Sequence, residues 1–330
     1  MEHLLYVEMY FDFEHINLIP KKCIVESRAE CDTSVKLGPH TFKLPVVPAN
    51  MECVINDEIA IKLASNGYFY IHHRFNVDAV EFCKKMKALN LISSISIGVN
   101  EDAHNTIFNL IKNDTIPDYI TIDIAHGHSI KMEKTLKIIR ESFIINIPYI
   151  IAGNVSTAEA VRDLESWGAN AIKVGIGPGS ACTTYIATGF GSRGAQASVV
   201  ENCANACLND STVIIADGGI KDAGDIAKSI VLGASFVMVG GLFSALSDSP
   251  GNTVQGIDGK LYKEFWGSAS SFQSNKKNRI EGTKKLLVMK QNTILDEMNS
   301  IHESLQSAIS YGGGNKLNDL KNVGYFIKHS

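Results

Sequence analysis

The stretch from residue 148 to residue 177 joins two kinds of secondary-structure pattern. It runs PYIIAGNV (148–155), then STAEAVRDLESW (156–167), then AIKVGIG (171–177). The first and last segments are short apolar runs, which are typical of buried strands, whereas the middle segment spaces its apolar residues like an amphipathic helix. The order strand, helix, strand predicts one βα repeat.

The same repeat continues along the chain of 330 residues, with most apolar runs starting about 23 to 29 residues apart and another amphipathic helix at 222–232. Strands buried on both faces are continuously apolar, so eight βα units predict a closed (β/α)8 TIM barrel. An open doubly wound sheet is the alternative, but polar residues at the strand ends favour a barrel because they would gather at one rim. The predicted strands are 44–50, 68–73, 93–99, 119–127, 148–155, 171–177, 212–219 and 235–241.

Two intervals break this rhythm. The starts of the sixth and seventh runs are about 41 residues apart, which leaves room for a loop at 178–195. After the last run, 244–292 shows little helical pattern but contains Asp258-Gly259, a hairpin signal. Long loops at a barrel rim often form lids. We therefore expect one catalytic domain covering 1–330, with an active-site flap at about 245–292.

Composition excludes several classes of protein. Lys plus Arg number 31 against 35 Asp plus Glu, the net charge is -4, and 45% of residues are apolar, which argues against disorder. Only Lys276-Lys277-Asn278-Arg279 is locally basic, so neither nucleic acid nor an anionic membrane is an expected partner. Seven cysteines, an odd number, do not suggest a disulfide framework, and no apolar run approaches a membrane span. A reducing, cytoplasmic location is expected.

A Gly-rich segment at 175–194 carries the strongest candidate for chemistry. Residues 189–194 fit G-x-G-x-x-G, but they do not directly follow a strand, so a Rossmann site is not favoured. Cys182 lies among Gly, Ser and Thr residues, where a thiolate can act as a nucleophile. Five of the other cysteines are expected to be inert core residues. These are Cys23, Cys53, Cys83, Cys203 and Cys207.

Paired glycines end the last two predicted strands, as Gly218-Gly219 and Gly240-Gly241. Barrels often bind phosphate through backbone amides in these loops, and Asp217 beside the first pair is suited to a ribose diol. The alternative is that these glycines only relieve crowding.

The fourth predicted strand ends in Asp123-Ile-Ala-His126-Gly-His128. A metal site is one interpretation, but the sequence offers no H-E-x-x-H motif or carboxylate cluster to complete it. We favour Asp123 as a hydrogen-bond acceptor at the barrel mouth.

Taken with their neighbours, these residues resemble the purine-nucleotide barrel family of GMP reductase and IMP dehydrogenase over nearly the whole chain. Dehydrogenases of this family usually insert a regulatory module after the second strand, for which 74–92 has no room, and carry an Arg-Tyr pair in the flap, which this chain lacks. Glu281-Gly282 resembles the reductase flap. The reductase branch is favoured over a dehydrogenase without its module and over a non-catalytic nucleotide-binding barrel. The segments that carry the resemblance are 11–13, 48–51, 123, 152–155, 173–184, 216–220, 239–242 and 267–270.

The resemblance implies NADPH-dependent reductive deamination of GMP to IMP and ammonia. Cys182 would attack C2 of guanine while Thr184 and Glu281 relay a proton. The implied substrate-binding residues are Met51, Ser180, Asp217, Gly218, Gly219, Gly240, Gly241, Ser268, Ala269 and Ser270. The implied cofactor-binding residues are Asp123, Ser96, Gly98, His73, Gln306, Ser307 and Tyr311, the last three reaching a neighbouring subunit's cofactor.

Carbonyls of Gly177, Gly179 and Cys182 match a monovalent-cation (K⁺) site of this family, and a homotetramer is implied. The sequence departs from many reductases at Tyr185, where they have Arg, and at Trp266-Gly267-Ser268, where they have Tyr-Gly-Met. His73 also stands where animal reductases have Lys.

Overall fold

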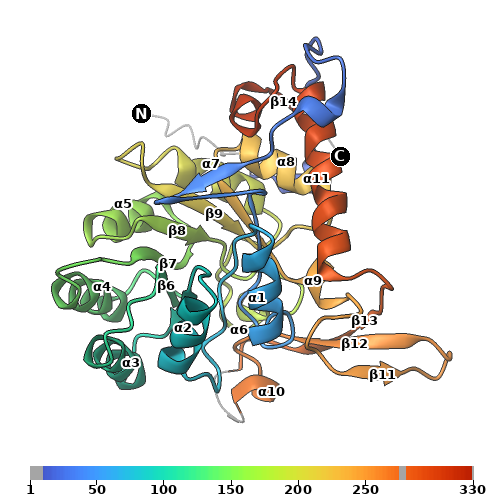
Figure 1. Cartoon of the computed structure of the whole chain (residues 1–330). Coiled ribbons are helices and arrows are strands. Elements are labelled where there is room, and N and C mark those ends of the chain that lie inside the picture. Colours follow the sequence, from blue (N-terminus) through green and yellow to red (C-terminus); the bar gives the residue numbers. More distant parts are fainter. Residues whose placement is uncertain (1–9, 275–279, 329–330) are drawn as a thin grey trace, which may run out of the picture.

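A curled parallel sheet of seven strands forms the centre of the computed structural model, which describes residues 10–274 and 280–328. The strand order is β4-β10-β9-β8-β7-β6-β5, and helices cover its outer face (Figure 1). This is the architecture of a TIM barrel. The basic cluster 276–279 noted in the sequence lies outside the described residues. The strands are β4 (Val46–Pro48), β5 (Ser94–Ile97), β6 (Tyr119–Asp123), β7 (Tyr149–Val155), β8 (Ala171–Val174), β9 (Val213–Asp217) and β10 (Phe236–Val239).

The prediction of a second strand at 68–73 was wrong, because this segment is not a β-strand. It is buried and occupies the gap between β4 and β5, where Lys43 N donates to the Gly67 carbonyl and His72 N donates to the Ser94 carbonyl. Side chains replace the remaining ladder bonds, since the Tyr70 hydroxyl donates to Ile92 O and accepts from Ser94 N. The eighth position of the barrel is therefore filled by an extended segment held largely through side chains.

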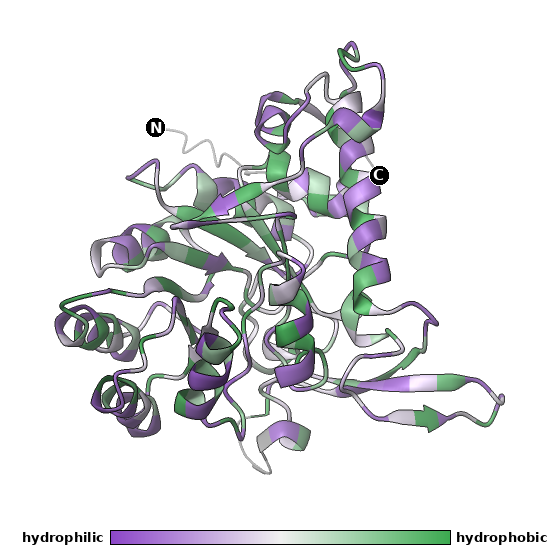
Figure 2. Cartoon of the chain, viewed as in Figure 1, coloured by the Kyte–Doolittle hydropathy of each residue, from purple (hydrophilic) through white to green (hydrophobic). Residues whose placement is uncertain are grey.

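Amphipathic helices surround the sheet as predicted. Thr157 caps α5 by accepting from Ala160 N, and Asp222 caps α8 by accepting from Asp225 N, so the expected helices at 156–167 and 222–232 are confirmed. Figure 2 shows mainly apolar strands inside and helices of mixed polarity outside. The helices are α1 (Asp57–Ser65), α2 (Ala79–Ala88), α3 (Glu101–Lys112), α4 (Ile130–Ser142), α5 (Ala158–Ser166), α6 (Thr184–Thr188), α7 (Gln196–Ala204), α8 (Ala223–Val231), α9 (Gly241–Ser244), α10 (Ser271–Ser274) and α11 (Ile294–Tyr311).

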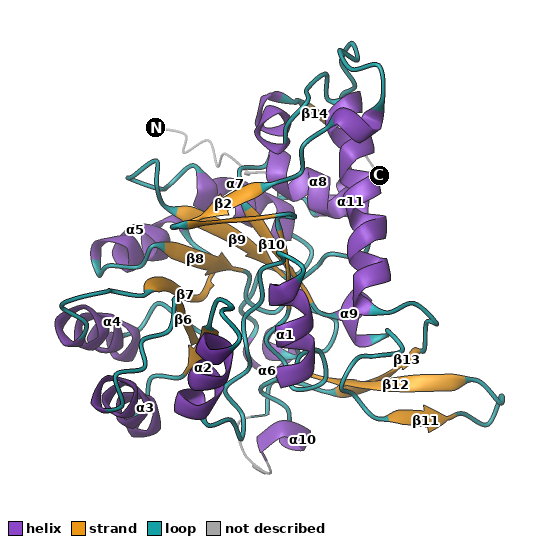
Figure 3. Cartoon of the chain, viewed as in Figure 1, coloured by secondary structure: helices purple, strands orange, loops and turns teal. Residues whose placement is uncertain are grey.

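A hairpin of β2 (Val35–Leu37) and β3 (His40–Phe42) closes the end of the barrel where the strands begin (Figure 3). The Phe42 ring lies 5.0 Å from Phe69 and 6.2 Å from Tyr119, within the apolar cluster inside the barrel. The hairpin therefore covers the interior of the barrel at this end. The short 3-10 helices η1 (Phe13–His15), η2 (Arg28–Glu30) and η3 (Leu317–Asn322), and the strand pair β1 (Ile16–Leu18) and β14 (Tyr325–Ile327), complete the fold.

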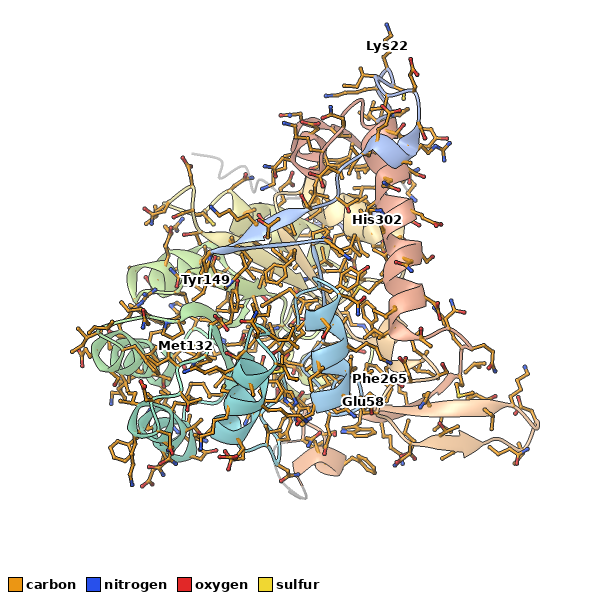
Figure 4. All side chains as sticks on the ribbon, viewed as in Figure 1. Lys22, Glu58, Met132, Tyr149, Phe265 and His302 are labelled. Carbon is orange, nitrogen blue, oxygen red and sulfur yellow. The ribbon has the colours of Figure 1, made fainter. Side chains whose placement is uncertain are left out.

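The segment expected to form a flap contains an antiparallel sheet of β11 (Thr253–Gln255), β12 (Leu261–Trp266) and β13 (Lys284–Val288). The Asp258-Gly259 hairpin signal is confirmed, because β11 and β12 pair directly across it and Gly259 has a φ of +77°. This sheet projects from the barrel (Figure 1). Phe265, labelled in Figure 4, anchors its base, since the Phe265 ring packs against Gly240.

None of the helices in 10–274 and 280–328 combines the length and the apolarity that a membrane span requires.

Candidate functional site

A cleft of about 940 Å³ opens at the carboxyl ends of the barrel strands. Its walls are the loops after β4, β6, β8, β9 and β10 together with the flap. Most residues predicted for the site line it. They are Met51, Asp123, Gly177, Gly179, Ser180, Cys182, Thr184, Asp217, Gly218, Gly219, Gly240, Gly241, Ser268, Ala269 and Glu281.

A chain of hydrogen bonds links Cys182, Thr184 and Glu281. The Cys182 thiol lies 3.2 Å from the Thr184 hydroxyl, which donates to Glu281 Oε2 at 2.8 Å. Thr184 is the first residue of α6, and this short helix inside the expected loop 178–195 brings its hydroxyl beside the thiol two residues away. A nucleophile, a hydroxyl and a carboxylate in contact form a route for proton transfer.

The other cysteines divide by burial. Cys53, Cys83 and Cys203 are buried, and burial raises the pKa of each thiol. Cys207 is half-buried, whereas Cys23 is exposed, so the expectation of a core residue was wrong for Cys23. The Cys23 thiol lies 3.2 Å from the Ser310 hydroxyl.

Backbone pairing draws the flap across the cleft. Thr183 N donates to the Glu281 carbonyl and Thr283 N donates to the Ala181 carbonyl, both at 2.9 Å. Glu281 N in turn donates to the Ala269 carbonyl at 3.1 Å. Two segments almost a hundred residues apart are thereby fixed side by side. Ser270, predicted for the substrate, is buried and donates its N–H to Gly267, so it supports the flap rather than lining the cleft.

The glycine pairs form part of the wall of the cleft. Gly218 and Gly219 have φ of +89° and +83°, which side-chain-bearing residues rarely adopt. A Cβ at Gly218 would lie 3.0 Å from the Gly179 amide, so the loops after β8 and β9 meet closely here. The resulting surface is backbone rather than side chain, as an anion site built from amides requires.

Two carboxylates and a lysine form the floor of the cleft. Lys173 Nζ lies 2.7 Å from Asp123 Oδ1 and 3.0 Å from Asp217 Oδ2. Burial alone raises the pKa of Asp123, but the Lys173 ammonium outweighs burial and the pKa lies below its usual value. Burial likewise disfavours charged Lys173, yet the two carboxylates raise its pKa overall. Asp123 and Lys173 are therefore both charged at neutral pH.

Lys173 and Asn154 were given no role in the sequence analysis. The register of β7 against β8 shifts between Gly153 and Val155, and this bulge turns the Asn154 amide toward Asp217 Oδ2 (2.8 Å) and the Gly175 carbonyl (2.7 Å). The signal for Lys173 was present, because a lysine within a fully buried strand must be paired.

Three residues predicted for the cofactor, Ser96, Gly98 and His73, do not line the cleft. Ser96 is buried and donates to the His72 carbonyl at 2.6 Å. His73 is also buried, and burial lowers its pKa to about 4. Gly98 leaves space beside Arg74, since a Cβ there would lie 3.5 Å from the guanidinium, and Arg74 itself lines the cleft. Arg74 was missed by sequence reasoning.

Gln306, Ser307 and Tyr311 lie on α11, outside the cleft of their own chain. Gln306 Nε2 donates to the carbonyls of Ala29 and Cys31, and Tyr311 is exposed. The chain by itself does not bring these three residues together with the rest of the predicted site.

Sequence patterns that suggested metals are used differently in the structure. His128 pairs with Asp163 at 2.7 Å, whereas Asp123 pairs with Lys173, so their side chains do not converge. No cluster of His, Cys, Asp or Glu suited to a metal occurs within the described part of the chain. In the predicted K⁺ loop, the Gly179 carbonyl accepts from Cys182 N at 3.0 Å.

Tyr185 and Trp266, two of the positions at which the sequence departs from many reductases, have different surroundings. The guanidinium of Arg193 lies 4.5 Å from the Tyr185 ring centroid, and Arg193 lines the cleft. Arg193 is the only charged residue in 178–195, a signal the sequence analysis did not use. Trp266 is buried and donates from Nε1 to Gln273, so its ring supports the flap.

A second cavity of about 500 Å³ lies at the opposite end of the barrel. Its Glu165 carboxylate accepts from the Leu208 and Asn209 amides and from the Thr212 hydroxyl, and Arg140 donates to Gly168 and Asn170. These polar groups hold loops together, which makes the first cleft the better candidate.

Comparison with known proteins shows the family of the chain. The family model described as "IMP dehydrogenase / GMP reductase domain" matches residues 10–330. The GMP reductase of Bacillus subtilis (strain 168) is 52% identical over 324 residues, covering 97% of each chain. That of Mycoplasma mycoides subsp. mycoides SC is 51% identical over 317 residues, covering 96% of this chain and 97% of its own. The chain therefore belongs to the IMP dehydrogenase / GMP reductase family.

Proposed function

We propose that this chain is a GMP reductase that converts GMP, NADPH and two protons into IMP, NADP⁺ and ammonium. The reductase function rests on full-length similarity to GMP reductases, which makes the chain an oxidoreductase. The observation that supports the mechanism is the hydrogen-bonded series Cys182, Thr184, Glu281 at the cleft.

Cys182 acts as the nucleophile on C2 of the guanine base. The thiolate forms the C2–S bond, and the exocyclic amino group must gain a proton before it can leave as ammonia. Glu281 supplies that proton through the Thr184 hydroxyl. This route needs no other residue, because Cys182, Thr184 and Glu281 are already in contact. Delivery of hydride to C2 would then let the C2–S bond break, with its electron pair leaving on sulfur as the regenerated thiolate.

The remaining cleft residues orient the nucleotide. Asp217 accepts hydrogen bonds from the ribose diol, while Ser180 and the amides of the two glycine pairs bind the 5′-phosphate. Met51 packs on the base, and the backbone at Ser268 and Ala269 binds the purine edge. Charge that develops on the ring during attack makes these last contacts count most in the transition state.

The residues on the Asp123 side fit a nicotinamide cofactor. Arg74 brings a cation to the cleft beside the space left by Gly98, and the Asn50 side chain hydrogen-bonds to Asp123. When bound, NADPH supplies the hydride for C2. Asp123 positions the nicotinamide and its ribose, with Ser96, Gly98 and His73 forming the wall behind.

Assembly completes the cofactor site. Gln306, Ser307 and Tyr311 cannot serve their own cleft, so we infer a homotetramer in which they reach a neighbour's cofactor. Analytical ultracentrifugation tests the oligomer. Carbonyls of Gly177, Gly179 and Cys182 are the proposed ligands of a monovalent cation, and replacement of K⁺ by Na⁺ should then lower turnover.

One assay separates this proposal from its nearest rival. NADPH absorbance at 340 nm is followed with GMP, and NADH formation is then followed with IMP plus NAD⁺. Oxidation of NADPH with release of ammonia supports the reductase. Formation of xanthosine monophosphate from IMP would instead identify a dehydrogenase without its regulatory module, and nucleotide binding without either reaction would identify a non-catalytic barrel.

A further inference from the structure

Lys173 lies between two acids to which the proposed function assigns different ligands. Its side chain is 2% exposed, and its ammonium bonds to Asp123 of β6 and to Asp217 of β9, the strands on either side of β7 and β8. Because one nitrogen contacts both carboxylate oxygens, these two oxygens lie no farther apart than the sum of the two contact distances. A single positive charge thus separates two negative charges at the floor of the cleft.

The surrounding strands leave room for Lys173 but give it little other stabilisation. A Cβ at Gly153 of β7 would lie 2.6 Å from Lys173 Cβ, so the lysine stem fits because position 153 has no side chain. Met238 of β10 places its sulfur 3.7 Å from Nζ. Among the described groups that face the cluster, Arg74 also acts on Asp123, and the uncharged Asn154 donates to Asp217.

We propose that Lys173 is a positioning residue that keeps Asp217 and Asp123 ionised together, so that the ribose of GMP and the cofactor can be bound at the same time. The roles of the two acids rest on the proposed function. The role of Lys173 rests on its two contacts and its burial. Lys173 needs no contact with either ligand.

Removal of the ammonium should create a carboxylate pair that shares a proton. Two like charges in one site raise the upper of the two apparent pKa values of the pair, so the shared proton is held to a higher pH than by an isolated aspartate. Asn154 and Arg74 remain in place in this variant. The shared proton is assigned to the pair of carboxylates, Asp123 and Asp217, rather than to either residue. A protonated aspartate is uncharged and one of its oxygens becomes a donor, so it accepts hydrogen bonds from a ribose diol more weakly.

The test measures the Kd of GMP by calorimetry from pH 6 to pH 8 without cofactor. Each variant's Kd is divided by that of the wild type at the same pH, which cancels titration of the GMP phosphate. For Lys173→Met this ratio should fall between pH 6 and pH 8, because the proton shared by the two carboxylates is lost as the pH rises. For Lys173→Arg, which keeps the charge, the ratio should be constant.

The double variant Asp123→Asn/Lys173→Met removes the repelling partner as well, so its ratio should also be independent of pH. Lys228→Met is the matched control, because Lys228 pairs with Asp225 on α8 away from the cleft. A ratio for Lys173→Met that is constant with pH would overturn the proposal and leave Lys173 a packing role. If Lys173→Met does not fold, restored folding and GMP binding in the double variant supports the proposal, and failure of both refutes it.

These outcomes are distinct from failure of the proposed function. A wild-type chain that binds and reduces GMP while Lys173→Met binds it with a flat ratio refutes only the role of Lys173. A wild-type chain that does not bind GMP refutes the function, and the assignment of Asp217 to the ribose falls with it.

Discussion

The substitution Glu281→Gln isolates the proton relay. In the wild type, the Thr184 hydroxyl donates to Glu281 Oε2 at 2.8 Å and lies 3.2 Å from the Cys182 thiol. A glutamine oxygen can still accept from Thr184, so the geometry is kept. The amide cannot give up a proton, however, and the leaving amino group loses its acid.

General acid assistance typically contributes about 10² to 10⁴ in rate. Glu281→Gln should therefore slow ammonia release by that factor, or about 3 to 5 kcal/mol in activation free energy. Adduct formation from IMP and oxidised cofactor bypasses ammonia release, so it should run near the wild-type rate. Stopped-flow absorbance at 340 nm measures adduct formation from IMP and oxidised cofactor, and an ammonia assay measures ammonia release.

Glu264→Gln is the matched control in the same flap. Glu264 pairs with Lys284 and accepts from Asn252, outside the relay, and its substitution should leave both rates within a small factor of wild type. Equal slowing of both processes by Glu281→Gln, or no slowing of either, would refute the relay and make Glu281 a structural flap residue.

Three further predictions address the nucleophile, the ribose acid and the pH dependence of stability. Cys182→Ala should abolish turnover but still bind GMP, because other loops hold the phosphate and ribose, and mass spectrometry of trapped wild type should find a purine adduct on Cys182. Activity retained by this variant would contradict covalent catalysis. Asp217→Ala should weaken GMP binding by roughly 2 to 4 kcal/mol, the range for removing a charged acceptor. Calorimetry with a 2′-deoxy analogue checks this, since a variant that still strongly prefers ribose would place the diol elsewhere. Burial lowers the pKa of His73 to about 4, so the neutral form stabilises the fold above its unfolded pKa near 6.5, and that stability is lost as pH falls toward 4. Urea unfolding should therefore lose about 2 kcal/mol between pH 7 and pH 5, a loss that His73→Gln should remove if the burial argument holds.

Local patterns in the sequence were sufficient for most of the barrel. Buried parallel strands are continuously apolar and the helices between them are amphipathic. The alternation of strands and helices can therefore be recognised in the sequence without knowledge of tertiary contacts. The segment 68–73 has the same apolar pattern but is not a strand. Apolarity predicts burial, whereas hydrogen bonding to neighbours depends on the Tyr70 and Ser96 hydroxyls, which replace backbone partners there.

The candidate site divides in the same way. Cys182 and Thr184 are two residues apart, and the glycine pairs follow their strands directly, so the chemistry of these positions is visible in short stretches of sequence. Glu281 was found only through resemblance to a family. Arg193 and Arg74 were missed because a charged residue in a loop has no periodicity to show which surface it faces.

The sequence by itself determined the repeat of strands and helices, the position of the nucleophile and the backbone loops beside it, because each depends on residues close together in the chain. Tertiary structure alone decided that Glu281 meets Thr184 and that Lys173 lies between Asp123 and Asp217. The physical reason is that closure of the barrel and the fold of the flap set these distances. Charges from β6, β8 and β9 meet only when parallel strands end at a common rim.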